Sequence, residues 1–345
     1  MIRFRWTLLL ALSVAIIHPG SLCGTESGKN DSPTQARVRV IIDNDFGGDP
    51  DGLFQLAHHL LSPSVEIRGI IGSHHYPKGL CGNPGAPENA CAAANELLAL
   101  MRVAGKIPVY QGAGGRIEKD LAPVSSDAAR HIVREAMEGN AGTPLYITCG
   151  GGLTDLASAY LMEPKIAERI RLVWIGGHEH EGIAIPPPGG QRIEYNMGID
   201  LRAAQVIFNQ SEIPIWQVPR DTYRQALVSC AEMGHRMNGE GKLAGFLNNR
   251  LQEFMTRAFD SRVETYVMGD SPLVLLTALQ SPWEADPSSC QYTNLPTPKI
   301  TDQGSYEKNP QGRPMRVYTH LDTRLMFEDF YAKIARFDQR SNAGK

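Results

Sequence analysis

The stretch from residue 37 to residue 61, RVRVIIDNDFGGDPDGLFQLAHHLL, joins an apolar run, an acidic loop and an amphipathic run. The apolar run at 38–43 is typical of a buried strand, and the run at 51–62 is typical of a helix. Four aspartates lie within nine positions at the junction: Asp43, Asp45, Asp49 and Asp51. Because like charges repel at such short spacing, the loop favours a bound hard cation, which prefers oxygen ligands and offsets the repulsion.

Apolar runs and amphipathic runs alternate along the rest of the chain. We expect further strands at 66–73, 107–112, 144–150, 171–177 and 213–218, an apolar run at 315–321, and helices at 88–105, 125–138, 153–170, 199–210, 223–236, 241–260, 272–280 and 322–338. Buried strands that alternate with helices predict an α/β fold with a Rossmann-like, doubly wound, mostly parallel sheet and helices on both faces. Pro-rich segments at 183–190 and 283–314 look like surface excursions, so we expect one domain, 37–340.

The first 23 residues have a pattern of their own. Arg3 and Arg5 precede an apolar run of eleven residues, and small residues follow. This is the plan of a secretory signal peptide, and the run is too short to be favoured as a membrane span. A buried first helix and a lipid anchor on Cys23 are the alternatives. We therefore expect an exported protein, periplasmic or extracellular, with a polar disordered segment at 24–36. In an oxidising compartment, Cys81 and Cys91 would form a disulfide.

The overall charge excludes some classes of partner. The chain has 34 Lys and Arg residues against 37 Asp and Glu residues, a formal charge of −3. No basic cluster indicates nucleic-acid binding or a polybasic membrane contact. No Cys and His spacing indicates a zinc site, and no apolar run after the first is long enough to span a membrane.

Several readings of the acidic loop compete. An EF-hand fails because Gly47 and Phe54 occupy positions that need oxygen ligands. A phosphatase with Asp43 as nucleophile and Asp45 as acid lacks a convincing later lysine and acidic pair. Helix capping and turn formation would explain only the last two of the four aspartates. A phosphate loop at 149–155 is not favoured because its glycines do not fit the required spacing. The remaining reading is a metal-activated water at a glycoside-cleaving centre.

This last reading agrees with a family resemblance. The acidic loop resembles the D-x-D-P-G-x-D-D motif of the inosine–uridine-preferring nucleoside hydrolases. Four later segments resemble that family in the same order: ANELLALMRVAGKIPVYQGA, GGLTDLASAYLMEPKIAERIRLVWIGG, EYNMGIDLRAAQVIFNQSEIPIWQVPRD and GDSPLVLLTAL. The sequence GGDPDG is closer to a divergent branch. The resemblance implies the nucleoside hydrolase fold, a calcium ion, and hydrolysis of the N-glycosidic bond of a ribonucleoside or related riboside.

The resemblance also implies roles for individual residues. Asp45 would ligate calcium and take the proton of the attacking water as general base. The other calcium ligands would be Asp51, Asp270 and the backbone carbonyl of Gly150. The ribose hydroxyls would contact Asp49, Glu194 and Asn196. The loop is one residue longer than the family motif, so Asp49 and Asp51 could exchange roles.

The leaving group is the point at which the resemblance fails. Base-specific members have a histidine directly before the late aspartate, whereas this chain has Gly269. Four histidines follow strand ends and could replace it, with Tyr266 as a further candidate: His74, His75, His178 and His180. We place His74 and His178 among the candidate substrate-binding residues.

Two other functions remain open from the sequence. One is a non-catalytic, calcium-dependent ribose- or sugar-binding module, and the other is a hydrolase of a different glycoside. The expected partner is a small molecule, a nucleoside or riboside. The sequence leaves open whether the protein forms a homo-oligomer.

Overall fold

The computed structural model describes residues 36–76, 85–139, 142–237, 241–259, 263–281 and 289–343, which belong to one compact unit, Gln35–Lys345. The predicted signal peptide lies outside these residues. Cys81 lies outside them as well, and its predicted disulfide partner Cys91 has a free thiol. Within the described ranges, no helix combines the length and apolarity needed to cross a membrane.

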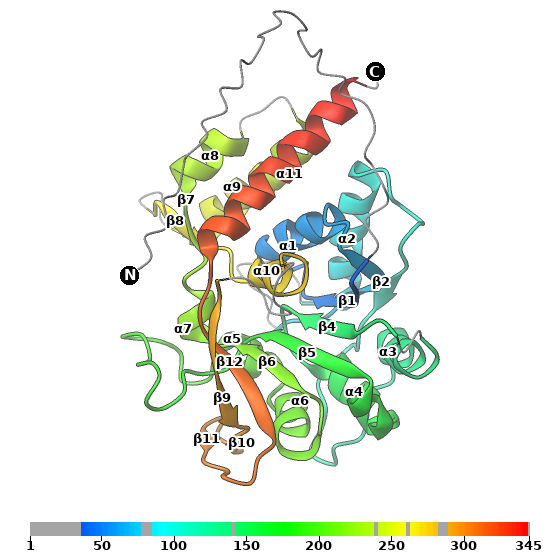
Figure 1. The fold of residues 1–345 in the computed structure, drawn as a ribbon, viewed down its shortest axis with the longest axis vertical. Helices are drawn as coiled ribbons and strands as arrows, with labels where there is room; N and C mark the ends of the chain where they lie inside the picture. The colour runs from blue at the N-terminus through cyan, green and yellow to red at the C-terminus, as the bar shows by residue number, and fades with distance from the viewer. Residues whose placement is uncertain are drawn as a thin grey trace, which may run out of the picture. The chain divides into compact units, whose positions relative to one another are not determined.

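An eight-stranded sheet forms the centre of this unit (Figure 1). Its strand order is β3-β2-β1-β4-β5-β6-β12-β9, and every neighbouring pair is parallel except β12 and β9. The strands are β1 (Val38–Asn44), β2 (Val65–Gly72), β3 (Val109–Gln111), β4 (Leu145–Cys149), β5 (Ile170–Ile175), β6 (Ile215–Val218), β9 (Gln291–Pro296) and β12 (Pro314–His320). Two small antiparallel sheets pair β7 (Leu227–Ser229) with β8 (Thr265–Val267) and β10 (Lys299–Ile300) with β11 (Tyr306–Glu307).

Helices cover both faces of the large sheet. Figure 1 shows α1, α2, α10 and α11 on one face and α3, α4 and α6 on the other. The α-helices are α1 (Asp51–Leu60), α2 (Pro87–Leu100), α3 (Asp127–Glu138), α4 (Thr154–Met162), α5 (Tyr195–Ile199), α6 (Leu201–Gln205), α7 (Arg220–Tyr223), α8 (Cys230–Met237), α9 (Lys242–Ala258), α10 (Pro272–Thr277) and α11 (Thr323–Ala343). A 3₁₀ turn spans Pro164–Glu168, and a π turn spans Val206–Gln210.

The first strand shows why this layering forms. All seven residues of β1 are buried, and successive side chains point to opposite faces of the sheet. Val40 and Ile42 join the core beneath α1 and α11, while Ile41 joins the core beneath α3 and α4. A strand that is buried along its whole length requires cover on both faces. The predicted doubly wound α/β fold is therefore confirmed.

Three segments differ from the sequence-based prediction. The expected surface excursion at 283–314 contains β9, which pairs antiparallel with β12 at the sheet edge. The expected helix at 223–236 is divided, because β7 separates α7 from α8. The helix α5 has no counterpart among the predicted elements.

Candidate active site

A pocket of about 320 Å³ opens at the carboxyl ends of β1, β4 and β5. Strand order reverses direction between β1 and β4, which is where open α/β sheets bind their ligands. Asp43 at the end of β1 lies opposite Cys149 at the end of β4, and the Gly150 amide donates to the Asp43 carbonyl at 3.0 Å. The lining includes seven of the predicted site residues: Asp45, Asp49, Asp51, Gly150, Glu194, Asn196 and Asp270.

Three of the aspartates are almost inaccessible to solvent. Asp45, Asp51 and Asp270 are 6%, 7% and 4% exposed. The backbone amide of Asp270 donates to Asp51 Oδ2 at 3.1 Å, which joins the loop after β1 to the turn before α10. Burial raises the pKa of Asp45 and of Asp51, and the charges of neighbouring aspartates raise both further. Burial and the charge of Asp49 raise the pKa of Asp270 to about 8.

The chemistry of this donor set fits a hard cation. Carboxylate oxygens and the Gly150 carbonyl are the ligands that calcium prefers, and a cation would relieve the repulsion that raises these pKa values. No side chain in the described part of the chain donates a hydrogen bond to the Asp45 carboxylate, although it is buried. The arrangement is not a completed coordination sphere. Among the described residues, no group of three or more His, Cys, Asp or Glu side chains has the geometry of a preformed metal site.

Glu194 and Asn196 form the wall of the pocket on the β5 side. The Glu194 carboxylate accepts hydrogen bonds from the Gly177, Asn196 and Met197 amides and from the Tyr223 hydroxyl, at 2.7 to 3.2 Å. These four donors fill the usual capacity of a carboxylate. Asn196 Nδ2 donates to the carbonyls of Gly150 at 3.2 Å and Ile175 at 2.7 Å, so only its Oδ1 is left to accept from a ligand.

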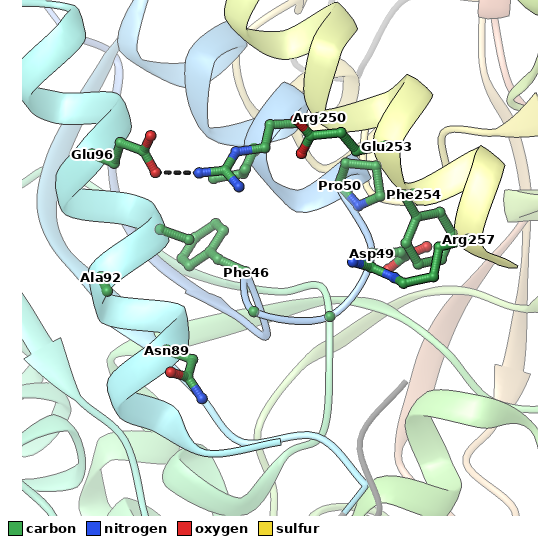
Figure 2. Close-up of a pocket in the computed structure, with 14 residues that line it drawn as sticks. Phe46, Asp49, Pro50, Asn89, Ala92, Glu96, Arg250, Glu253, Phe254 and Arg257 are labelled. Atoms are coloured by element: carbon green, nitrogen blue, oxygen red, sulfur yellow. Dashed lines mark hydrogen bonds and ion pairs between the residues drawn. The ribbon is translucent and has the colours of Figure 1, made fainter. Parts of the chain in front are cut away.

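The loop that carries Asp49 separates this pocket from a second one. Tyr266 donates a hydrogen bond to Asp49 Oδ2, and Phe254 of α9 lines both pockets. Figure 2 shows the second pocket, of about 330 Å³, between α2 and α9. There Arg250 pairs with Glu96, and the Arg257 guanidinium lies 5.9 Å from the Phe254 ring centre. Asp49 and Phe254 thus form the partition between the two spaces.

Two predicted substrate-binding histidines lie outside the candidate active site. His74 follows β2 but turns away, and its Nδ1 lies 3.1 Å from the Ala113 carbonyl after β3. His178 follows β5, and its Nε2 lies 2.9 Å from the Gly304 carbonyl. It lines a different cavity of about 690 Å³, together with His180 and Tyr306. Neither histidine is among the residues that line the pocket, because the end of a strand sets the position of the backbone and not the direction of the side chain.

Sequence reasoning missed several residues of the pocket wall. The aromatic or apolar lining residues not predicted are Ile175, Tyr195, Tyr223, Phe254, Phe259 and Val267. Tyr223 and Phe254 lie in segments whose sequence predicts ordinary helices, and no local pattern distinguishes them from other apolar positions. The pocket therefore has acidic residues at the strand ends and an aromatic wall contributed by later helices.

Comparison with known proteins agrees with this geometry. The sequence profile of the inosine-uridine preferring nucleoside hydrolases matches residues 40–324. The chain belongs to this family. An inosine-uridine preferring nucleoside hydrolase of Leishmania major is 28% identical over 320 residues, covering 86% of this chain and 96% of the relative. The relative of the same name from Crithidia fasciculata is 24% identical over the same length, with the same coverage.

Solved structures show the same fold. A purine-preferring ribonucleoside hydrolase from Gardnerella vaginalis superposes with a TM-score of 0.65 at 19% identity, covering 87% of this chain and 99% of that one. The plant nucleoside hydrolase PpNRh1 gives the same TM-score at 16% identity, with 86% and 99% coverage. As a nucleoside hydrolase, the chain is an enzyme of the N-ribosyl hydrolase class, and this family is metal-dependent.

Proposed function

We propose that this nucleoside hydrolase cleaves the N-glycosidic bond of ribonucleosides with a calcium ion at the carboxyl ends of β1 and β4. One observation carries the proposal: residues from three distant segments, Asp45 and Asp51, Gly150, and Asp270, line one pocket. Core packing does not explain why carboxylates from distant segments are buried in one pocket, whereas a bound hard cation would explain it. Membership of a metal-dependent family supports the same proposal.

Asp45, Asp51, Asp270 and the Gly150 carbonyl would hold the cation. A bound calcium ion would supply a Lewis acid that lowers the pKa of the attacking water and orients it. The Asp45 carboxylate would accept the proton from that water, since it is buried and has no competing side-chain donor among the described residues. The neighbouring carboxylates would stabilise the positive charge that develops on the ribosyl ring.

The substrate's ribose and leaving group would occupy different walls of the pocket. Asp49 and the Oδ1 atom of Asn196 would accept hydrogen bonds from ribose hydroxyls. Glu194 would act as a positioning group, because its acceptor sites are already filled by the protein. Phe254 and Phe259 would contact the leaving group, since aromatic faces suit a nucleobase.

Proton transfer to the leaving group would fall to a phenol. Gly269 offers no side chain at the pocket edge, while Tyr266 lines the pocket and donates to Asp49. Burial and the charge of Asp49 raise the pKa of Tyr266 well above its usual value, so this phenol stays protonated at neutral pH. His74 and His178 are not part of this proposal, because neither lines the pocket.

One observation favours the second candidate, a calcium-dependent sugar-binding module. At Gly269 the pocket has no ionisable side chain before Asp270, so the usual acid is missing. A binding module would retain ribose affinity and release no product. Measurement of free ribose therefore separates the two candidates.

The deciding experiment compares the purified protein with its Asp45→Asn variant. Release of free ribose from a panel of nucleosides should fall by about 10²–10⁴-fold in the variant, the usual contribution of a general base, and should also be lost when calcium is chelated. Asp338→Asn is the matched control, because Asp338 is equally buried but caps α9. No ribose release by the unmodified protein from any nucleoside or activated riboside would overturn the enzymatic proposal.

We also propose that the protein is exported. The charged start, apolar run and small residues of 1–23 support this compartment. Intact-mass measurement on protein from the secreted or periplasmic fraction should give a chain beginning near residue 24. A chain that keeps residues 1–23 and stays in the cytoplasm would contradict the proposal.

A further inference from the structure

A chain of buried polar side chains leads from the helical layer to Asp270. Asn44 Nδ2 donates to Asp270 Oδ2 at 2.9 Å and to Gln55 Oε1 at 3.2 Å. Gln55 Nε2 bonds to His59 Nδ1, and His59 Nε2 lies 2.9 Å from Thr277 Oγ1. Four elements thus contribute: β1, α1, α10 and the turn before α10.

The direction of every hydrogen bond follows from the last member. The Thr277 hydroxyl donates to the Leu273 carbonyl at 2.6 Å, so its oxygen is left to accept from His59 Nε2. His59 Nδ1 must then accept from the Gln55 amide nitrogen, and Gln55 Oε1 must accept from Asn44. Burial lowers the pKa of His59 well below its usual value, in keeping with the neutral ring that this order requires. The order leaves the Asn44 amide nitrogen directed at the Asp270 carboxylate.

Two glycines leave the space that Asn44 occupies. A Cβ atom on Gly52 would lie 2.9 Å from Asn44 Oδ1, and a Cβ atom on Gly150 would lie 2.3 Å from Asn44 Nδ2. Both distances are shorter than side-chain atoms tolerate. Any larger residue at either position would displace Asn44, so its orientation depends on the backbone on both sides.

The burial of these residues has no packing explanation. Asn44 and Gln55 are 0% exposed, His59 and Thr277 are 1% exposed, and α1 otherwise packs apolar side chains such as Phe54 and Leu56 into the core. Polar groups in such surroundings cost stability unless every one is paired, and apolar residues would fill the same volume at lower cost. The series of hydrogen bonds ends at the Asp270 carboxylate in the pocket, and a role in holding that carboxylate explains why polar residues occupy these positions.

We propose that Asn44, Gln55, His59 and Thr277 are positioning residues that fix the orientation of the Asp270 carboxylate toward the cation. Asn44 holds one oxygen of Asp270, and the other remains for the pocket. The inference rests on the proposed function, in which Asp270 is a calcium ligand. A residue that contacts a metal ligand, as Asn44 contacts Asp270, typically changes metal affinity or activity by about 10–100-fold when it is removed. Gln55, His59 and Thr277 act through Asn44.

Gln55→Met tests the middle of the chain. Methionine keeps the length of the side chain and removes both hydrogen bonds. Calorimetric titration should show calcium affinity about 10–100-fold weaker than in the unmodified protein, with a matching fall in kcat. His58→Gln is the matched control, because His58 is equally buried on α1 but pairs with Asp329 of α11. Its calcium affinity should stay within about twofold of the unmodified protein, whatever its effect on thermal stability.

Thr277→Val and Thr277→Ser test the far end of the chain and decide the matter if Gln55→Met does not fold. Valine removes the acceptor of His59 with almost no change in shape, whereas serine keeps the hydroxyl. Calcium affinity should weaken about tenfold with valine and be restored with serine. Gln55 and Thr277 do not line the pocket, so their substitution has no direct effect on contacts with a ligand.

The two levels of the proposal fail in different ways. Unmodified protein that binds no calcium and releases no ribose would remove the proposed function and this inference with it. Unmodified protein that binds calcium, together with folded Gln55→Met and Thr277→Val proteins of undiminished calcium affinity, would overturn the positioning chain alone.

Discussion

The backbone amide of Asp270 donates to Asp51 Oδ2 at 3.1 Å, although 219 positions separate the two residues. Asp49, two residues earlier, instead accepts from Tyr266. The longer loop therefore directs Asp51 toward the turn before α10 and Asp49 toward the aromatic wall. The two carboxylates have different surroundings, which favours Asp51 as the metal ligand and Asp49 as the ribose partner.

Substitution of these two aspartates should give opposite results. Asp51→Asn should weaken calcium binding, measured by calorimetry, by at least about tenfold because a charged ligand is lost. Asp49→Asn should keep its calcium affinity and raise the KM for nucleosides, since a ribose contact is weakened. Calcium retained in Asp51→Asn and lost in Asp49→Asn would reverse the assignment.

Gly150 should not tolerate a side chain. A Cβ atom there would lie 2.8 Å from Asp270 Cγ and closer still to Asn44. Gly150→Ala should therefore displace Asp270 and reduce calcium affinity and kcat together, by about tenfold or more. Gly115→Ala is the control, because a Cβ atom at that position meets nothing within 4 Å. Equal calcium affinity in the two variants would show that Gly150 is not part of the metal site.

Cleavage rates of ribosides with different leaving groups should show the effect of Gly269 in place of the family's histidine. Tyr266 already donates to Asp49 and would replace the family's histidine only in part, so p-nitrophenyl riboside, whose leaving group departs without a proton, should be cleaved faster than inosine or uridine. The difference should stay below the about 10²–10⁴-fold that a complete general acid contributes. Tyr266→Phe should slow cleavage of the nucleosides further and leave cleavage of the activated riboside unchanged, because only the nucleosides need the proton. His74→Ala and His178→Ala should leave the ratio of the two rates unchanged. A ratio that rises in either histidine variant would return that residue to the site.

A buried ion pair in the wall of the 690 Å³ cavity should control stability at acidic pH. Arg220 and Glu179 are joined by two hydrogen bonds of 2.6 and 2.7 Å. Burial opposes ionisation of Glu179, but the hydrogen bonds and charge of Arg220 outweigh it and lower the pKa below the usual 4.5. The stabilisation is thus present above about pH 4.5 and is lost as the pH falls through the lowered pKa.

Glu179→Gln tests this ion pair by urea unfolding at several pH values. The variant should lose about 3 kcal/mol of unfolding free energy at pH 7, as for other broken buried pairs, and the difference should shrink below about pH 4.5. Glu181→Gln is the control, because Glu181 pairs with Lys308 and both side chains are exposed to solvent. Its unfolding free energy should not change measurably. A Glu179→Gln difference that is constant with pH would exclude the ion pair as its cause.

The sequence predicts the layers of this fold better than its edges. β1 and β4 are recognisable because they are rich in apolar residues, and both strands are buried along their whole length. β9 is not recognisable, because an edge strand is half exposed and tolerates its terminal Pro296, so its sequence resembles a loop. The break between α7 and α8 depends on the pairing of Leu227 with Val267, a contact between distant segments that no local pattern encodes.

The same limit applies to the pocket. The aspartates at the end of β1 are predictable because four carboxylates within nine positions have few explanations. The histidines are not, because His74 and His178 turn toward the Ala113 and Gly304 carbonyls, and these contacts depend on tertiary structure. Gln55 and His59 carry a weak signal in the sequence, since two polar side chains four residues apart share the buried face of α1.

A crystal structure with calcium and ribose bound tests the central claim most directly. Anomalous scattering should locate one calcium ion within about 2.3–2.6 Å of oxygens from Asp45, Asp51, Asp270 and the Gly150 carbonyl. Ribose hydroxyls should contact Asp49 and Asn196 Oδ1. Calcium at another position, or ribose bound in this pocket with no metal beside these aspartates at saturating calcium, would contradict the claim.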